Sequence, residues 1–187
     1  MSEFWTYFQL GYDHILDMAG YDHMLFLVAL VASYAYYHYK EILILVTAFT
    51  VGHCITLILA GKGWIDLDAR VIEIGIATTI ALTAGINLLA RTGSRIYRYF
   101  ITLIFGLIHG LGFSGFIRAL IGRDEVLWRP LLYFNLGVEI GQILFVAILI
   151  VINYMAIRWL RVKLVWWTHM LSLIALVWSI NMILERV

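Results

Sequence analysis

One stretch decides the fold: residues 130–156, which read PLLYFNLGVEIGQILFVAILIVINYMA. A helix needs about 20 apolar residues to cross the hydrocarbon core of a bilayer. The only charged side chain in this run is Glu139. The stretch therefore predicts a transmembrane helix.

Similar apolar runs fill most of the remaining chain, and only short hydrophilic joints separate them. We place the other predicted spans near 22–39, 42–60, 71–90, 98–121 and 164–184. With 63% hydrophobic and 13% charged residues, the composition is that of a membrane protein. Alternating ten-residue strands are absent, which favours helices over a barrel. We predict an all-α, polytopic integral membrane bundle of about six transmembrane helices, in a single domain over residues 1–187.

The first 20 residues predict a short helix lying at the membrane interface. Their large apolar side chains follow helical spacing at Trp5, Phe8, Tyr12 and Ile15. The segment also carries Glu3, Asp13 and Asp17 without a basic residue. Because positive charge marks the cytoplasmic side, we expect an inner-membrane protein of bacterial type with its N-terminus outside.

Charge and cysteine content exclude several other classes. The net charge is +1 and no basic run occurs, so nothing favours nucleic-acid binding. Cys54 is the lone cysteine, which excludes a disulfide framework and a cysteine zinc site.

Polar and ionisable residues occur inside the predicted spans, where each costs at least ~2.5–3.5 kcal/mol near the bilayer centre. They are Asp22, His23, His53, Glu73, His109, Asn135, Glu139 and Gln142. The last three are spaced i, i+4 and i+7 and so form one stripe of one helix, which must face protein or water. Singly, Asp22 is equally well a helix N-cap, and a lone histidine is more often an interhelical hydrogen-bonding group. Ionisable residues from several spans together favour one shared polar site.

Imidazole and carboxylate groups together suit a divalent transition-metal ion such as nickel, cobalt or zinc, whereas calcium or magnesium would call for oxygen ligands alone. We expect His23, His53, His109, Asp22 and Glu139 to supply ligands. The expected supporting residues around them are Glu73, Asn135 and Gln142.

The glycines around His109, in FGLIHGLGFSG at residues 105–115, have an explanation in the same site. Small residues let two membrane helices approach closely. Gly106, Gly110 and Gly112 are therefore expected to bring a neighbouring helix near enough for imidazoles from different helices to converge.

Five motifs in order resemble the HupE/UreJ family of membrane proteins. They are GYDHILDMAGYDHMLFLVAL at 11–30, FTVGHCITLILA at 49–60, FGLIHGLGFSG at 105–115, FNLGVEIGQ at 134–142 and SLIALVWSINMILERV at 172–187. Members are associated with hydrogenase and urease accessory functions and are regarded as nickel or cobalt permeases. The resemblance implies that the metal motifs fall on His14, Asp22, His23, His53 and His109, and on Asn135, Glu139 and Gln142.

Three functions remain open on the sequence. A permease or metal-binding protein is favoured, with a metal ion and the lipid bilayer as partners and a homo-oligomer or accessory protein left open. An intramembrane hydrolase with a fixed metal would use Glu139 or Glu73 as general base. A rhomboid-like serine protease would use Ser114 in the GFSG sequence with His169. So short a pattern arises easily by chance in a glycine-rich span, however. The helix of His169 also lacks the glycine one turn later that would let it pack against the helix of the serine.

Overall fold

The computed structural model describes residues 2–89, 94–121 and 128–187, and every regular element in these ranges is a helix. The α-helices are α1 (Glu3–Leu16), α2 (Asp22–Ala32), α3 (Tyr39–Gly61), α4 (Ala69–Leu88), α5 (Arg95–Gly112), α6 (Ser114–Ile121), α7 (Trp128–Tyr154) and α8 (Leu164–Arg186). Short 3-10 turns cover Met18–Gly20 and Tyr36–His38, and a π-helical turn covers Met155–Trp159. The predicted all-α class is confirmed.

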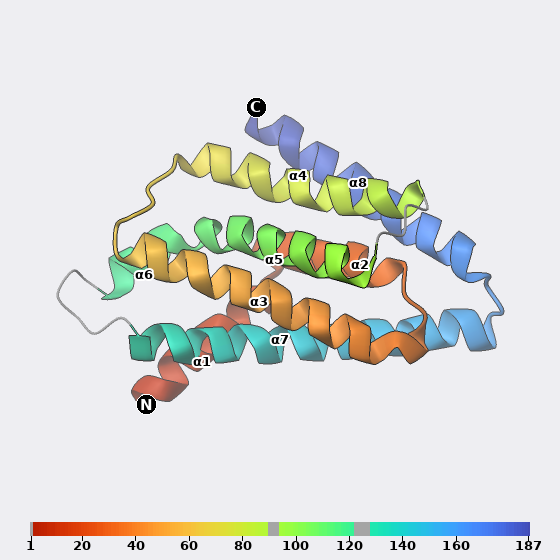
Figure 1. Cartoon of the computed structure of the whole chain (residues 1–187), viewed down its shortest axis with the longest axis horizontal. Helices are drawn as coiled ribbons and strands as arrows, with labels where there is room; N and C mark the ends of the chain where they lie inside the picture. Colours follow the sequence, from red (N-terminus) through yellow and green to blue (C-terminus); the bar gives the residue numbers. More distant parts are fainter. Residues whose placement is uncertain (1, 90–93, 122–127) are drawn as a thin grey trace.

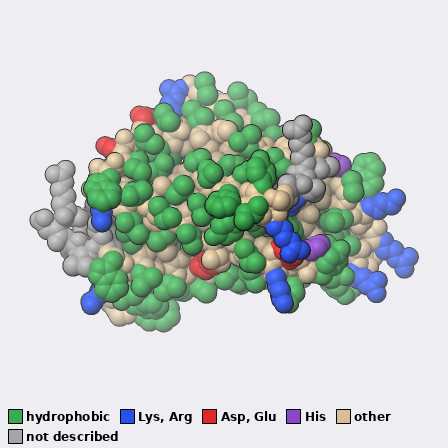
Figure 2. Space-filling model, in the orientation of Figure 1, with side chains coloured by type: hydrophobic (Ala, Val, Ile, Leu, Met, Phe, Trp, Pro, Cys, Tyr) green, Lys and Arg blue, Asp and Glu red, His purple; other side chains and the backbone are tan. Residues whose placement is uncertain are grey.

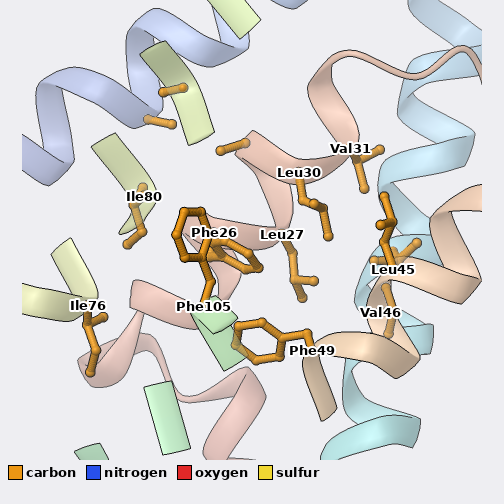
Figure 3. Packing of buried hydrophobic residues seen from close by; sticks show 14 of the residues in the cluster. Phe26, Leu27, Leu30, Val31, Leu45, Val46, Phe49, Ile76, Ile80 and Phe105 are labelled. Atoms are coloured by element: carbon orange, nitrogen blue, oxygen red, sulfur yellow. The ribbon is translucent and has the colours of Figure 1, made fainter. Parts of the chain in front are cut away.

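The helices form three packed pairs: α1 with α7, α3 with α5, and α4 with α8 (Figure 1). The short helix α2 lies among them and contacts α4, α7 and α8. Most of its residues are buried, and Phe26 and Leu27 are fully so. Figure 3 shows Phe26 beside Phe49 of α3 and Phe105 of α5 in the apolar core.

Within the described residues, four helices are long and apolar enough to cross a membrane: Tyr36–Gly61, Ala69–Leu88, Trp128–Trp159 and Leu164–Arg186. Hydrophobic side chains cover the middle of the face in Figure 2, while Lys and Arg gather toward its two ends. This is the pattern of a bundle whose waist contacts lipid. The length and apolar composition of these helices are those of an integral membrane protein.

The expected number of about six spans differs from these four. The predicted span 22–39 is the helix α2, which at 11 residues is about 16 Å long and too short for a core about 30 Å thick. The predicted span 98–121 divides into α5 and α6 at Phe113, next to Gly112. Hydropathy measures apolar content and does not detect such breaks.

Glycines allow the close contacts within two of the pairs. A methyl group at Gly52 would overlap the carbonyl of Leu103, and one at Gly106 would overlap the carbonyl of Phe49. Helix α1 meets α7 in the same way, because Gly11 and Gly137 each lie against backbone of the opposite helix. The segment expected at the interface therefore packs lengthwise on α7, and its last turn reaches the bundle interior.

Candidate metal centre

The break between α1 and α2 brings three polar side chains together. His14 lies in the last turn of α1, and Asp22 and His23 are the first two residues of α2. The imidazole rings of His14 and His23 are 4.6 Å apart between centroids. A discontinuous helix in a membrane bundle places side chains and helix ends at one internal point.

Helix α3 adds a third imidazole at this break. The ring of His53 lies 5.9 Å from that of His14 and 5.8 Å from that of His23. One nitrogen from each of the three rings lies within 4.8 Å of the other two. Three imidazole nitrogens this close together are a candidate set of ligands for one metal ion.

Hydrogen bonds fix which nitrogen of His23 is free. Its Nδ1 lies 2.7 Å from the carboxylate oxygen Oδ1 of Asp22, which also accepts the backbone N–H of His23. Because a carboxylate accepts, Nδ1 carries the proton and the lone pair is on Nε2. This pairing of carboxylate, imidazole and open nitrogen is the arrangement that orients metal-binding histidines.

His109 of α5 stands next to this group, with its ring 5.0 Å from that of His23. Its Nε2 lies 2.9 Å from the hydroxyl of Thr79, and that hydroxyl donates to the carbonyl of Ile76. Nε2 of His109 is therefore the donor, which leaves the lone pair on Nδ1. Gly110 supports this placement, because a methyl group there would overlap the backbone of His53. The close approach expected at Gly106 and Gly110 is present, whereas Gly112 meets only the side chain of Ile76.

Unpaired buried nitrogens are the most informative feature of the centre. They are His14 Nε2, His23 Nε2, His53 Nδ1 and Nε2, and His109 Nδ1. A buried polar atom without a partner costs about 1–3 kcal/mol. Together they form a set of nitrogen donors at one place, and neutral imidazoles fit a transition-metal ion.

The polar stripe of α7 faces α3, as its spacing predicts, but it makes contacts of its own. Thr47 donates to Oε1 of Glu139 at 2.7 Å, and Thr50 donates to Oε1 of Gln142 at 2.8 Å. Asn135 is buried and donates to the carbonyl of Leu131. The group of three histidines does not include the Glu139 carboxylate.

Two other candidates have partners outside the histidine group. Glu73 is half exposed and pairs with Arg186 at 3.0 Å, which ties α4 to the end of α8. The hydroxyl of Ser114 donates to the carbonyl of Leu111 at 2.6 Å and so does not donate to an imidazole. The geometry thus gives no support to Glu73 beside the metal or to Ser114 as a nucleophile.

An open pocket of about 440 Å³ borders the centre, between the last turns of α1 and the junction of α5 with α6. His14, Asp13 and Asp17 line it together with Phe113. The ring of Phe113 lies 4.2 Å from that of His14. Sequence reasoning used the two aspartates for orientation only, and it missed Thr47, Thr50 and Thr79, because threonine in an apolar helix carries no signal of its own.

Comparison with known proteins gives one finding. Residues 1–184 match the family described as HupE / UreJ protein. No curated protein and no solved structure matches the chain. Since the match spans nearly every residue, the chain belongs to the HupE/UreJ family.

Proposed function

We propose that this chain is a membrane permease for a divalent transition-metal ion, namely nickel, cobalt or zinc, with the metal as its cargo. One observation carries the proposal: unpaired buried nitrogens of His14, His23 and His53 converge at a helix break. The HupE/UreJ family is linked to nickel and cobalt handling, which agrees with this donor set.

The acidic pocket is the proposed access route. Asp13 and Asp17 would attract a cation to the mouth, and His14 would receive it at the inner end of the pocket. His23 and His53 then complete the coordination, with His109 as the next ligand inward. We further propose that this end faces the outside, so that the ion is captured there.

The opposite side of the centre is closed by aromatic side chains. The rings of Phe26 and Phe49 lie 5.1 and 5.0 Å from the ring of His109, and both side chains are fully buried. The ring of Phe105 in turn packs edge-on against that of Phe26. A route open at one end and closed at the other is one state of an alternating cycle.

Contacts of the carboxylates favour transport over hydrolysis. A fixed catalytic metal would need a general base within about 3 Å of the metal-bound water. Asp22 is held by His23, and Glu139 accepts from Thr47 at the α3–α7 contact. Asp22 therefore already has a partner, and Glu139, whose Oε2 is buried without one, does not belong to the group of three histidines.

Flux measurement tests the proposal directly. The purified protein is reconstituted into proteoliposomes, and uptake of labelled nickel, cobalt and zinc is followed with and without a proton gradient or voltage. We expect uptake of at least one ion that is lost in His23→Ala and His53→Ala but kept in His169→Ala, a histidine of α8. Bound metal that stays for hours, with no flux of any of the three ions, would refute transport and favour a fixed site.

A further inference from the structure

A second large cavity lies at the end of the bundle opposite the acidic pocket. Its volume is about 550 Å³, within the roughly 300–1,000 Å³ range of small-molecule sites. It forms where α2 ends and where α3 and α5 begin, and its lining includes Ser33, His38, Lys40, Arg95 and Arg98. The metal centre does not use any of these residues.

Positive charge dominates this cavity. Its one acidic residue, Glu41, is already paired with Arg95 at 3.4 Å. Among the described residues, Lys40 and Arg98 have no carboxylate partner. Arg98 lies 5.1 Å from the ring centroid of Tyr34 and makes a long contact of 3.4 Å to the hydroxyl of Ser33. Most of the guanidinium donors of Arg98 therefore remain available to a ligand.

A metal cation does not suit such a lining, because two unpaired positive side chains would repel it. Three features favour an anion instead. Arginine and lysine are the usual phosphate-binding side chains, and α3 and α5 both direct their N-terminal ends, with partial positive charge, toward this region. The ring nitrogen Nδ1 of His38 is also buried without a hydrogen-bond partner.

Apolar walls adjoin the cations. Ile44 and Leu45 line the cavity, and Ile44 is 56% exposed on the outer face of α3. A narrow slot continues inward from the cavity along Leu30, Ile101 and Phe105. The two spaces share Arg98 and Leu45, so charged and apolar surfaces meet at one place.

From this juxtaposition we propose that the cavity binds a phosphate-bearing anion, the headgroup of an anionic phospholipid, through Lys40, Arg95 and Arg98. The acyl chains would lie along Ile44 and Leu45. Basic clusters at a membrane surface attract anionic lipids in this manner. The proposal is independent of metal transport.

Native mass spectrometry of the delipidated full-length protein tests the site. The probes are phosphatidylglycerol, phosphatidylcholine and inorganic phosphate, each added separately. We expect phosphatidylglycerol to bind stoichiometrically and more tightly than phosphatidylcholine. Its dissociation constant should rise about tenfold or more in the double variant Arg95→Gln/Arg98→Gln, because two charge-assisted contacts are lost.

The matched control is Arg158→Gln/Lys163→Gln, which removes the same charge from the same end of the bundle but outside the cavity lining. Equal weakening in the control would overturn the proposal, since the effect would then be one of general surface charge. Binding of inorganic phosphate without phosphatidylglycerol would overturn the lipid assignment. If the double variant does not fold, Lys40→Gln changes an exposed side chain of the same cavity, and unchanged lipid affinity in that variant would equally contradict the site.

Discussion

Replacing Gly110 by alanine tests whether close helix packing builds the histidine centre. A Cβ atom at Gly110 would lie 2.5 Å from the carbonyl oxygen of His53, about 1 Å short of van der Waals contact. That carbonyl is backbone, so α5 must move away from α3 to admit the methyl group. The movement would carry His109 away from His53.

Two opposing effects set the size of the change. Alanine in a helix is favoured over glycine by about 1 kcal/mol, whereas overpacking costs about 1–3 kcal/mol. We expect the free energy of unfolding to fall by up to about 2 kcal/mol, which is a melting temperature lower by up to about 8 °C for a chain of this size. Displaced ligands should also weaken nickel binding about tenfold or more.

The control is Gly85→Ala in α4, because a Cβ atom there meets nothing within 4 Å. This variant gains the helical preference of alanine without the clash, so its melting temperature should be unchanged or higher and its nickel affinity unchanged. Thermal unfolding in detergent and isothermal titration with nickel measure both quantities. If Gly110→Ala melts and binds nickel as Gly85→Ala does, the packing explanation of the glycines is wrong.

Three further substitutions address individual contacts. Asp22→Asn removes the charge that orients His23 and should weaken nickel binding about 10- to 100-fold by calorimetry, while the exposed Glu3→Gln should not. Thr79→Val leaves Nε2 of His109 without its hydrogen-bond partner and should weaken nickel binding about tenfold. The control is Thr78→Val, which should leave nickel binding unchanged because the hydroxyl of Thr78 contacts its own helix. Equal nickel affinities of the two variants would mean that His109 is not a ligand. Asp13→Asn should lower uptake at limiting metal but not at saturating metal, because excess ion compensates for weaker capture; equal loss at both concentrations would contradict a role in capture.

The sequence predicts the helical class and a shared polar site of His23, His53, His109 and Glu139, because the cost of burying ionisable groups requires a common explanation. The structure groups His23 and His53 with His14, places the ring of His109 5.0 Å from that of His23, and leaves Glu139 outside the group. The sequence also predicts the close approach at Gly106 and Gly110. The interruption between α1 and α2 is not predictable in this way, since hydropathy is blind to helix continuity.

Side-chain partners are a second feature that sequence pattern does not provide. Thr78 and Thr79 are adjacent threonines in one apolar helix, yet only Thr79 contacts an imidazole. The sequence pattern places Glu73 beside the metal, but in the structure Glu73 pairs with Arg186, which lies 113 residues later in the chain. Such choices depend on helix rotation and register, which the three-dimensional packing sets.

Uneven support of the histidines bears on transport. His23 and His109 are each fixed by a hydrogen bond from one ring nitrogen, to Asp22 and Thr79. His53, by contrast, is fully buried with neither nitrogen paired. A structural metal site gains affinity by orienting every ligand, whereas conduction requires binding strong enough to admit the ion and weak enough to release it. His53 is held by packing between the rings of Phe49 and Phe134 and not by a hydrogen bond to a ring nitrogen. A centre that orients two of its imidazoles by hydrogen bonds and leaves both nitrogens of the third to the ion agrees with the temporary coordination that the proposed transport requires.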